Sequence, residues 1–276
     1  MPRTTIVGEP LPNIPWRDRP PGCSDVVWRY DENPVVPRDA IPGADRVFNS
    51  AVVPWEGAFV GVFRADRRSG YPDLYVGRSP DSIRWDIDDT AIRFVGEDGE
   101  PREPILYGYD PRVVKIEDDH YVTWCNYFHG PTIGVARTRD FETFVQLENA
   151  FVPFNRNGVL FPRRLGGLYT MLNRPSDNGH TPFGDIYLSQ SPDMTFWGKH
   201  RLVLKAPHYW WKNTKIGAGP IPIETSEGWL LIYHGVCQTC SGLVYSLGAA
   251  LLDLEDPSRV IVDCSDHLLT PQAPYE

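Results

Sequence analysis

The sequence has little of what marks secreted, membrane-spanning or nucleic-acid-binding proteins. It contains five cysteines in 276 residues, and its first residues lack an apolar stretch followed by small residues. We therefore expect no signal peptide and a reducing, cytoplasmic location. No apolar run approaches the roughly 20 residues of a membrane span, so no membrane is expected as a partner. The net charge of −9, without a basic run, argues against nucleic acid as a partner.

Closely spaced cysteines occur once, as the C-x-x-C pair Cys237 and Cys240. A zinc site would need a second pair or histidines at ligand spacing. A redox motif would need a strand–helix–strand context around the pair. Neither is found in the sequence, so no metal site is expected.

Aromatic residues, proline and glycine are abundant, with 9 Trp, 13 Tyr, 12 Phe, 27 Pro and 24 Gly. This composition favours many short strands and turns over long helices. Residues 1–40 are irregular and Pro-rich, and we predict an N-terminal arm that wraps over the body or takes part in assembly. Residues 41–276 are predicted to form the folded domain.

A pattern of two strands, a third short strand and a polar turn recurs through this domain. The matching turns start at Ser79, Thr138 and Ser191, a period of about 50 to 60 residues. Several strands in each unit of that length are typical of a β-propeller. The end pieces that would close the ring are short. We therefore predict an all-β, five-bladed β-propeller whose last blade is either incomplete, which we favour, or completed by the arm.

The first strand of each propeller blade lines the central channel, so polar residues that open these strands are expected to converge on the axis. Their recurrence at equivalent places in successive repeats is hard to explain by packing. The residues in question are Asn49 and Ser50, Tyr109 and Asp110, Arg156 and Asn157, and Lys215 with Gly217.

Asp110 is the candidate acid among them. Pro111 biases it towards an extended or turn conformation, and on local sequence alone a turn cap is the better interpretation. Its place in the repeat favours function. Ordinary glycoside hydrolysis uses two carboxylates, and a second one at an equivalent position is lacking. A single acid with several cations fits attack by an oxyanion such as phosphate. The cations expected in the channel are Arg64, Arg156, Lys215 and His234.

Long, non-repetitive segments between about residues 45 and 260 carry a family resemblance. They include F-N-S-A-V-V, Y-G-Y-D-P-R-V-V, N-R-N-G-V-L-F-P-R-R and K-I-G-A-G-P-I-P-I-E-T-S-E-G-W. They resemble the mannoside phosphorylases of glycoside hydrolase family one hundred and thirty. The resemblance implies a five-bladed propeller and homo-oligomer that cleaves β-mannosides, with inorganic phosphate as a substrate and no metal or organic cofactor. The segments N-R-N-G-V-L-F-P-R, H-T-P-F-G-D and Y-H-G-V-C-Q-T-C look most like the subgroup that acts on 4-O-β-mannosyl-glucose.

The resemblance also implies residue roles. Asp110 would be the general acid, with its proton reaching the glycosidic oxygen through the 3-hydroxyl of the mannose. Phosphate would attack the anomeric carbon from the opposite face, so that inversion gives α-mannose 1-phosphate and glucose. The implied phosphate ligands are Arg64, Arg156, Asn157, Lys215 and His234. The implied mannose contacts are Asn49, Ser50, Tyr109, His180 and Tyr245, with Arg174 and Asp185 as further candidates in the same segments.

Three alternatives remain open: a β-1,4-mannooligosaccharide phosphorylase, a β-mannosidase that uses water, and a non-catalytic sugar-binding propeller. The cations argue against the hydrolase, and an acid with a basic cluster argues against simple sugar binding. Loops around Trp210, Trp211 and 237–245 are expected to frame the acceptor subsite, although the two tryptophans are as readily explained by packing. The arm and the loop from His208 to Trp211 are candidate contacts between subunits.

Overall fold

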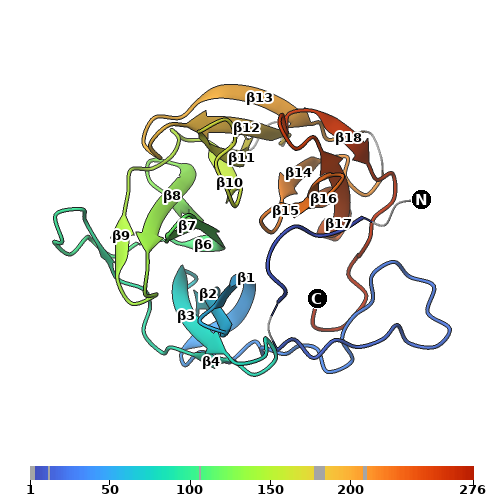
Figure 1. Cartoon of the computed structure of the whole chain (residues 1–276). Helices are drawn as coiled ribbons and strands as arrows, with labels where there is room; N and C mark the ends of the chain where they lie inside the picture. The colour runs from blue at the N-terminus through green and yellow to red at the C-terminus, as the bar shows by residue number, and fades with distance from the viewer. Residues whose placement is uncertain (1–3, 12, 106, 177–183, 208–209) are drawn as a thin grey trace. The chain divides into compact units, whose positions relative to one another are not determined.

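The structure is a computed structural model that describes residues 4–11, 13–105, 107–176, 184–207 and 210–276 (Figure 1). These residues form β-strands, turns and irregular segments, and no helix occurs among them. The chain divides into two compact units. Unit 1 comprises Met1–Glu9, Asp18–Arg29 and Phe154–Glu276, and unit 2 comprises Pro10–Arg17 and Tyr30–Pro153.

Unit 2 contains two sheets. The first is an antiparallel meander of β1 (Ala44–Trp55), β2 (Ala58–Arg67), β3 (Pro72–Ser79) and β4 (Asp86–Ile87). The second is a meander of β6 (Tyr109–Ile116), β7 (Asp119–Tyr127), β8 (Pro131–Thr138) and β9 (Phe144–Gln146), to which β5 (Phe94–Val95) adds in parallel. Alternating apolar residues of the strands form the core of the unit, where Val62, Val122 and Trp124 are almost completely buried.

Unit 1 also contains two sheets. One runs through β10 (Asn155–Leu160), β11 (Tyr169–Pro175), β12 (Ile186–Ser191) and β13 (Gly198–Leu204). The other runs through β14 (Lys215–Ala218), β16 (Gly228–Thr239), β17 (Gly242–Leu252) and β18 (Val260–Asp263), with the short β15 (Ile223–Thr225) also paired to β16. The core of this unit lies around Phe161, Trp211 and Trp229, none of which is exposed.

Each sheet has the topology of a propeller blade, which is a meander that begins with an edge strand. These edge strands are β1, β6, β10 and β14. The predicted repeat is therefore confirmed at the level of single blades. The polar residues expected to open the first strands lie on those strands: Asp110, Arg156 and Lys215 are first or second in β6, β10 and β14, whereas Asn49 lies in the middle of β1.

Five blades were predicted, and the described residues form four. The segment after Asp263 has one isolated bridge, Leu247 to Leu269, and the described part of the arm has one, Ile6 to Thr225. Both segments are rich in proline, which cannot donate a ladder hydrogen bond and is largely excluded from sheet interiors. They therefore add no fifth sheet to the described part of the chain.

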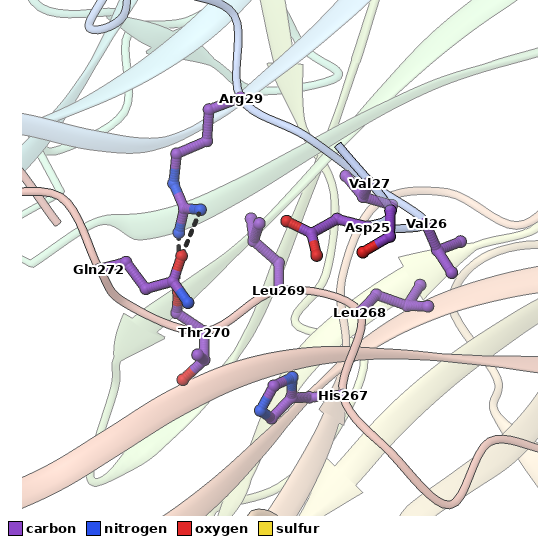
Figure 2. A pocket seen from close by; sticks show the side chains of 10 residues that line it. Asp25, Val26, Val27, Arg29, His267, Leu268, Leu269, Thr270 and Gln272 are labelled. Atoms are coloured by element: carbon purple, nitrogen blue, oxygen red, sulfur yellow. Dashed lines mark hydrogen bonds between the residues drawn. The ribbon is translucent and has the colours of Figure 1, made fainter. Parts of the chain in front are cut away.

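Part of the arm contacts the C-terminal segment within unit 1. Arg29 donates hydrogen bonds to the Thr270 carbonyl (2.7 Å) and to Oε1 of Gln272 (3.3 Å). Figure 2 shows the pocket of about 300 Å³ between the two segments, with Asp25 and His267 among its lining residues. The arm and the C-terminal segment are thus fixed to one another by an arginine fork rather than by a sheet.

The described residues form no helix, and therefore none that is long and apolar enough to cross a bilayer.

The turns that join the third and fourth strands of all four sheets share one design. In each, Oδ1 of an aspartate accepts the backbone N–H groups two and three residues later, which closes an Asx turn. The sequence pattern predicted three of these turns, after Ser79, Thr138 and Ser191. The four aspartates are Asp81, Asp140, Asp193 and Asp253.

Because of these bonds, we expect the free energy of unfolding to fall in acid. The N–H of Arg84, and then that of Ile83, lowers the pKa of Asp81 to about 2, and the pKa of Asp193 is lowered in the same way. A carboxyl with a depressed folded-state pKa stabilises the protein above its unfolded pKa, and this contribution is lost as pH falls through the folded value. The window is therefore from about pH 4 down to about pH 2.

The measurement is the urea midpoint at successive pH values through this window, for the wild type and for an Asp81→Asn/Asp193→Asn double variant. The asparagine oxygens still accept the turn hydrogen bonds but do not titrate. The variant should lose less stability on acidification than the wild type, and parallel curves for the two proteins would contradict the assignment.

Candidate active site

The first strands of three sheets carry the same backbone irregularity. Asn49, Asp110 and Asn157 have left-handed φ values of 50°, 51° and 54°, and each lies where the ladder to the next strand shifts register. Asparagine and aspartate adopt this conformation more readily than other non-glycine residues. Bulges of this kind redirect a side chain away from the regular alternation of a strand. The repeat thus gives three polar side chains equivalent placements at the first strands of their sheets.

The Asp110 side chain of unit 2 is held by two donors. Nδ2 of Asn49 and Nη1 of Arg64 each lie 2.8 Å from Oδ1 of Asp110. Both donors reach the same oxygen, and Oδ2 is the oxygen that neither of them contacts. The carboxyl group is about one-sixth exposed, with a side-chain accessibility of 17%. It is therefore fixed in orientation and still open to a small reactant.

Arg64 is itself fixed by a second carboxylate, Asp66. Nε and Nη2 of Arg64 donate to the two oxygens of Asp66 at 2.9 and 3.2 Å, a bidentate pair. The guanidinium also lies over the rings of Phe48, 4.0 Å from its centroid, and Tyr109, at 5.3 Å. Arg64 was predicted as a phosphate ligand, but in the structure its described hydrogen bonds go to Asp110 and Asp66.

Asp66 was not among the residues predicted from the sequence. It follows Arg64 by two positions on β2, so the two side chains share one face of the strand. A charged pair with this spacing is ordinary on a strand, and nothing in the sequence relates it to Asp110. Because both Asp66 oxygens accept from Arg64, Asp66 acts as a support for the arginine.

Unit 1 contains a cluster of basic side chains that come from both of its sheets. Nη1 of Arg174, on β11, lies 3.1 Å from Nε2 of His234, on β16. Gly217 makes this approach possible, because a Cβ atom there would lie 2.6 Å from the His234 ring and 2.8 Å from the Arg174 guanidinium. Arg174 is only 6% exposed and also passes over Gly184. It was a minor candidate in the sequence and is central in the structure.

Lys215 belongs to the same cluster. Burial lowers its pKa from the ordinary lysine value, and the charges of Arg174 and then Arg156 lower it further. Its ammonium lies 5.8 Å from the centroid of the Tyr245 ring, which in turn lies 5.8 Å from the His234 ring. A partly buried lysine whose pKa is lowered by burial and by neighbouring arginines is a candidate for a functional site, and the excess of positive charge favours an anion there.

The sheet that runs from β10 to β13 supplies Arg156 and Asn157, both on β10. Nη1 of Arg156 donates to the Ser176 hydroxyl at 2.7 Å, and Asn157 is only 5% exposed. Beneath them, Asn155 donates to Asn173 (3.1 Å) and Asn173 to Ser189 (2.8 Å), which forms a buried polar ladder across three strands. Fully paired ladders of this kind hold strands in a fixed register. This ladder supports the start of β10, where Arg156 is the second residue.

Several predicted residues lie elsewhere. Oδ1 of Asp185 accepts the backbone N–H of Ala206 at 2.8 Å, which is a structural contact between the residue that precedes β12 and the segment after β13. Trp211 is completely buried, whereas Trp210 is 64% exposed, so the pair is divided between packing and surface. His180 and His208 lie outside the described residues. Ser50 is half-buried on β1 beside Asn49.

The five cysteines are free, and Cys237 and Cys240 lie at the end of β16 and in the turn that follows. Among the described residues, no group of three or more His, Cys, Asp or Glu side chains is arranged to hold a metal ion. Each unit thus has its own group of candidate residues: unit 2 carries an acid with its supports, and unit 1 carries a cluster of basic side chains.

Comparison with known proteins identifies the family. A family model described as beta-1,4-mannooligosaccharide phosphorylase matches residues 9–276. The Beta-1,4-mannooligosaccharide phosphorylase of Ruminococcus albus is 56% identical over 281 residues, which cover 99% of this chain and 84% of the relative. The 4-O-beta-D-mannosyl-D-glucose phosphorylase of Bacteroides fragilis is 29% identical, over 89% of this chain and 67% of the relative.

Among solved structures, the complex of Beta-1,2-mannobiose phosphorylase from Listeria innocua with beta-1,2-mannobiose aligns with a TM-score of 0.77. The two sequences are 25% identical, and the alignment covers 90% of this chain and 85% of the other. The fold is thus of the all-β, propeller-like type, and the protein class is that of the glycoside phosphorylases, which transfer a glycosyl group to phosphate. Within this class, the chain belongs to glycoside hydrolase family one hundred and thirty, the family that its sequence segments resemble.

The comparisons favour a different subgroup from the one that the short segments suggested. The 56% identical relative is named for mannooligosaccharides, and the relative named for mannosyl-glucose is 29% identical. A mannooligosaccharide is therefore better supported than mannosyl-glucose as the substrate.

Proposed function

We propose that the protein catalyses inverting phosphorolysis of β-1,4-mannooligosaccharides, releasing α-mannose 1-phosphate and a chain that is one sugar shorter. The observation that carries the proposal is the cation cluster of unit 1. His234 and Lys215 lie on the paired strands β16 and β14, and Arg174 reaches His234 from β11 of the other sheet; burial and then the neighbouring arginines lower the pKa of Lys215. A hydrolase has no use for such a cluster, whereas a phosphate nucleophile needs its charge neutralised and its oxygens oriented.

In this proposal the reaction is a single displacement. A phosphate oxygen, held by Arg156, Asn157, Lys215 and His234 with Arg174 behind them, forms a bond to the anomeric carbon of the terminal mannose. The bond from that carbon to the glycosidic oxygen breaks, and its electron pair goes to the leaving sugar. The proton that the leaving oxygen takes up comes from Asp110, by way of the 3-hydroxyl of the mannose. Asn49, Ser50, Tyr109 and Tyr245 contact the sugar.

The support for Asp110 as the acid is the way it is held. Its Oδ1 accepts N–H bonds from Asn49 and Arg64, so we assign the transferable proton to Oδ2. Arg64, fixed by Asp66, acts as a positioning residue for the acid. A fixed acid is expected to contribute about 10² to 10⁴-fold to the rate.

The test is to incubate the purified protein with β-1,4-mannobiose, β-1,4-mannotriose or 4-O-β-mannosyl-glucose, with and without inorganic phosphate. Phosphorus NMR and sugar chromatography measure α-mannose 1-phosphate and free mannose. We expect mannose 1-phosphate only when phosphate is present, and a higher kcat/KM with mannobiose than with mannosyl-glucose.

The other outcomes separate the alternatives. Mannose released equally well without phosphate would identify a hydrolase. A higher kcat/KM with mannosyl-glucose would restore glucose as the acceptor. Sugar binding without any product would identify a non-catalytic binding protein.

A further inference from the structure

Three exposed tyrosines of unit 2 contact one another on the surface. Tyr71, Tyr107 and Tyr127 have relative exposures of 57%, 37% and 64%. The ring of Tyr107 lies between the other two, with centroid distances of 6.4 Å to Tyr71 and 6.3 Å to Tyr127, and both contacts are edge-to-face. Aromatic residues are mostly buried, so a contiguous exposed group of three requires an explanation other than core packing.

The three tyrosines are held at one edge of the two sheets. Tyr71 precedes β3, Tyr107 precedes β6, and Tyr127 is the last residue of β7, which runs antiparallel to β6. The backbone N–H of Gly108 donates to the carbonyl of Pro72 at 3.1 Å, which joins the segments that carry Tyr107 and Tyr71. The rings are therefore presented by connected backbone at strand ends.

This surface is continuous with the candidate acid. The Tyr107 ring lies 5.5 Å from the ring of Tyr109, and the Arg64 guanidinium lies 5.3 Å from the same Tyr109 ring. Arg64 donates to Asp110 at 2.8 Å. An unbroken series of contacts within unit 2 thus leads from the acid to the exposed tyrosines.

We propose that Tyr71, Tyr107 and Tyr127 form a carbohydrate-binding subsite that takes sugar units of the β-1,4-mannooligosaccharide beyond the bond that is cleaved. The proposal rests on the proposed function. Sugar rings carry C–H groups on their faces and hydroxyl groups at their edges, and tyrosine offers an apolar ring with a hydroxyl at its tip. Edge-to-face rings present faces in different directions, which suits a chain whose successive sugars are rotated relative to one another.

The subsite predicts that long substrates are used better than short ones. We expect kcat/KM of the wild type to rise from mannobiose to mannohexaose, and a Tyr71→Ala/Tyr127→Ala variant to lose about tenfold with mannohexaose, which corresponds to about 1.4 kcal/mol. Its kcat/KM with mannobiose should stay within about twofold of the wild type. Phe196→Ala is the matched control, because Phe196 is a 72% exposed aromatic residue of unit 1. A Tyr71→Phe/Tyr127→Phe variant, which keeps the rings, should retain most of the preference for long chains.

Several results would overturn the subsite. One is equal use of mannobiose and mannohexaose by the wild type, which leaves the proposed function intact. Another is an equal loss in the alanine variant with both substrates. A third is a change in oligomeric state by light scattering without a chain-length effect, which would identify a contact between copies. If mannobiose gives no mannose 1-phosphate, the proposed function fails first. Calorimetric titration of wild type and alanine variant with mannohexaose then tests the subsite alone, and equal affinity of the two proteins would refute it.

Discussion

Replacing Asp110 by asparagine is expected to lower kcat for mannobiose phosphorolysis by about 10²- to 10⁴-fold, because general acids contribute on this scale and asparagine carries no transferable proton. The substitution is nearly isosteric. It also suits the backbone, since asparagine tolerates the left-handed φ of 51° at this position. The affinity for substrate and the thermal midpoint should therefore change little. Steady-state kinetics with calorimetric binding of mannobiose makes the measurement.

A substrate with a better leaving group distinguishes an acid from a merely structural residue. The leaving group of 4-nitrophenyl β-mannoside is 4-nitrophenolate, a stable anion that needs no proton. Where the wild type cleaves this substrate with phosphate, the Asp110→Asn variant should keep most of that rate. Asp110→Ala supplies a second comparison, because alanine in a left-handed conformation costs about 1–2 kcal/mol. It should lower the thermal midpoint, which Asp110→Asn should not. An asparagine variant with near wild-type turnover of mannobiose would show that Asp110 is not the acid.

The repeat in the sequence predicted Asp110 as the candidate acid, but it did not predict how the side chain of Asp110 is held. The repeat located it at the opening of a first strand, beside Tyr109 and Pro111. The bulge that redirects its side chain is a property of the ladder between β6 and β7, where the register shifts. The Arg64–Asp66 pair looks in the sequence like any charged pair on an exposed strand face. Only the placement of β2 beside β6 relates it to the acid.

The repeat itself was predicted well because it depends on local chemistry. The aspartate turns after Ser79, Thr138 and Ser191 are closed by hydrogen bonds to N–H groups two and three residues away. Such turns are fixed by a few neighbouring residues. The number of blades depends instead on which distant segments pair, and proline-rich ends can be read as strands or as irregular segments. The fifth blade was expected to be incomplete or to be completed by the arm, and the described residues lack it.

The cation cluster shows the same division between local and distant information. Lys215 and Arg156 were predicted because they open repeat strands, and His234 because it lies in a matching segment of the fourth repeat. The importance of Arg174 was underestimated, since its position depends on Gly184 and Gly217, two residues remote in sequence that leave room for its side chain. The absence of a Cβ at such a position has meaning only once the neighbouring strands are known.

Arg174→Met is expected to raise the KM for phosphate by about 10- to 100-fold, because Arg174 holds the proposed phosphate ligand His234 and hydrogen bonds to charged groups contribute about 1.5–3 kcal/mol. Methionine retains most of the alkyl stem that passes over Gly184 and removes the charge beside His234. The KM for mannobiose should change much less. Arg163→Met is the matched control. Arg163 also belongs to unit 1 and lies over a tryptophan ring, but it pairs with Glu224 and not with the cluster.

The same variant should also change how phosphate binding depends on pH. The loss of binding at alkaline pH should begin at a higher pH than in the wild type. Burial is the largest cause of the lowered pKa of Lys215, and the positive charge of Arg174 is the second. Removing that charge raises the pKa of Lys215, but burial still holds it below the ordinary lysine value of 10.5. Phosphate binding weakens as Lys215 loses its proton, so the weakening should begin at a higher pH in Arg174→Met than in the wild type. It should be absent from Lys215→Arg, whose guanidinium stays charged. An alkaline limb that stays in place in Arg174→Met, or that persists in Lys215→Arg, would show that a different group titrates there.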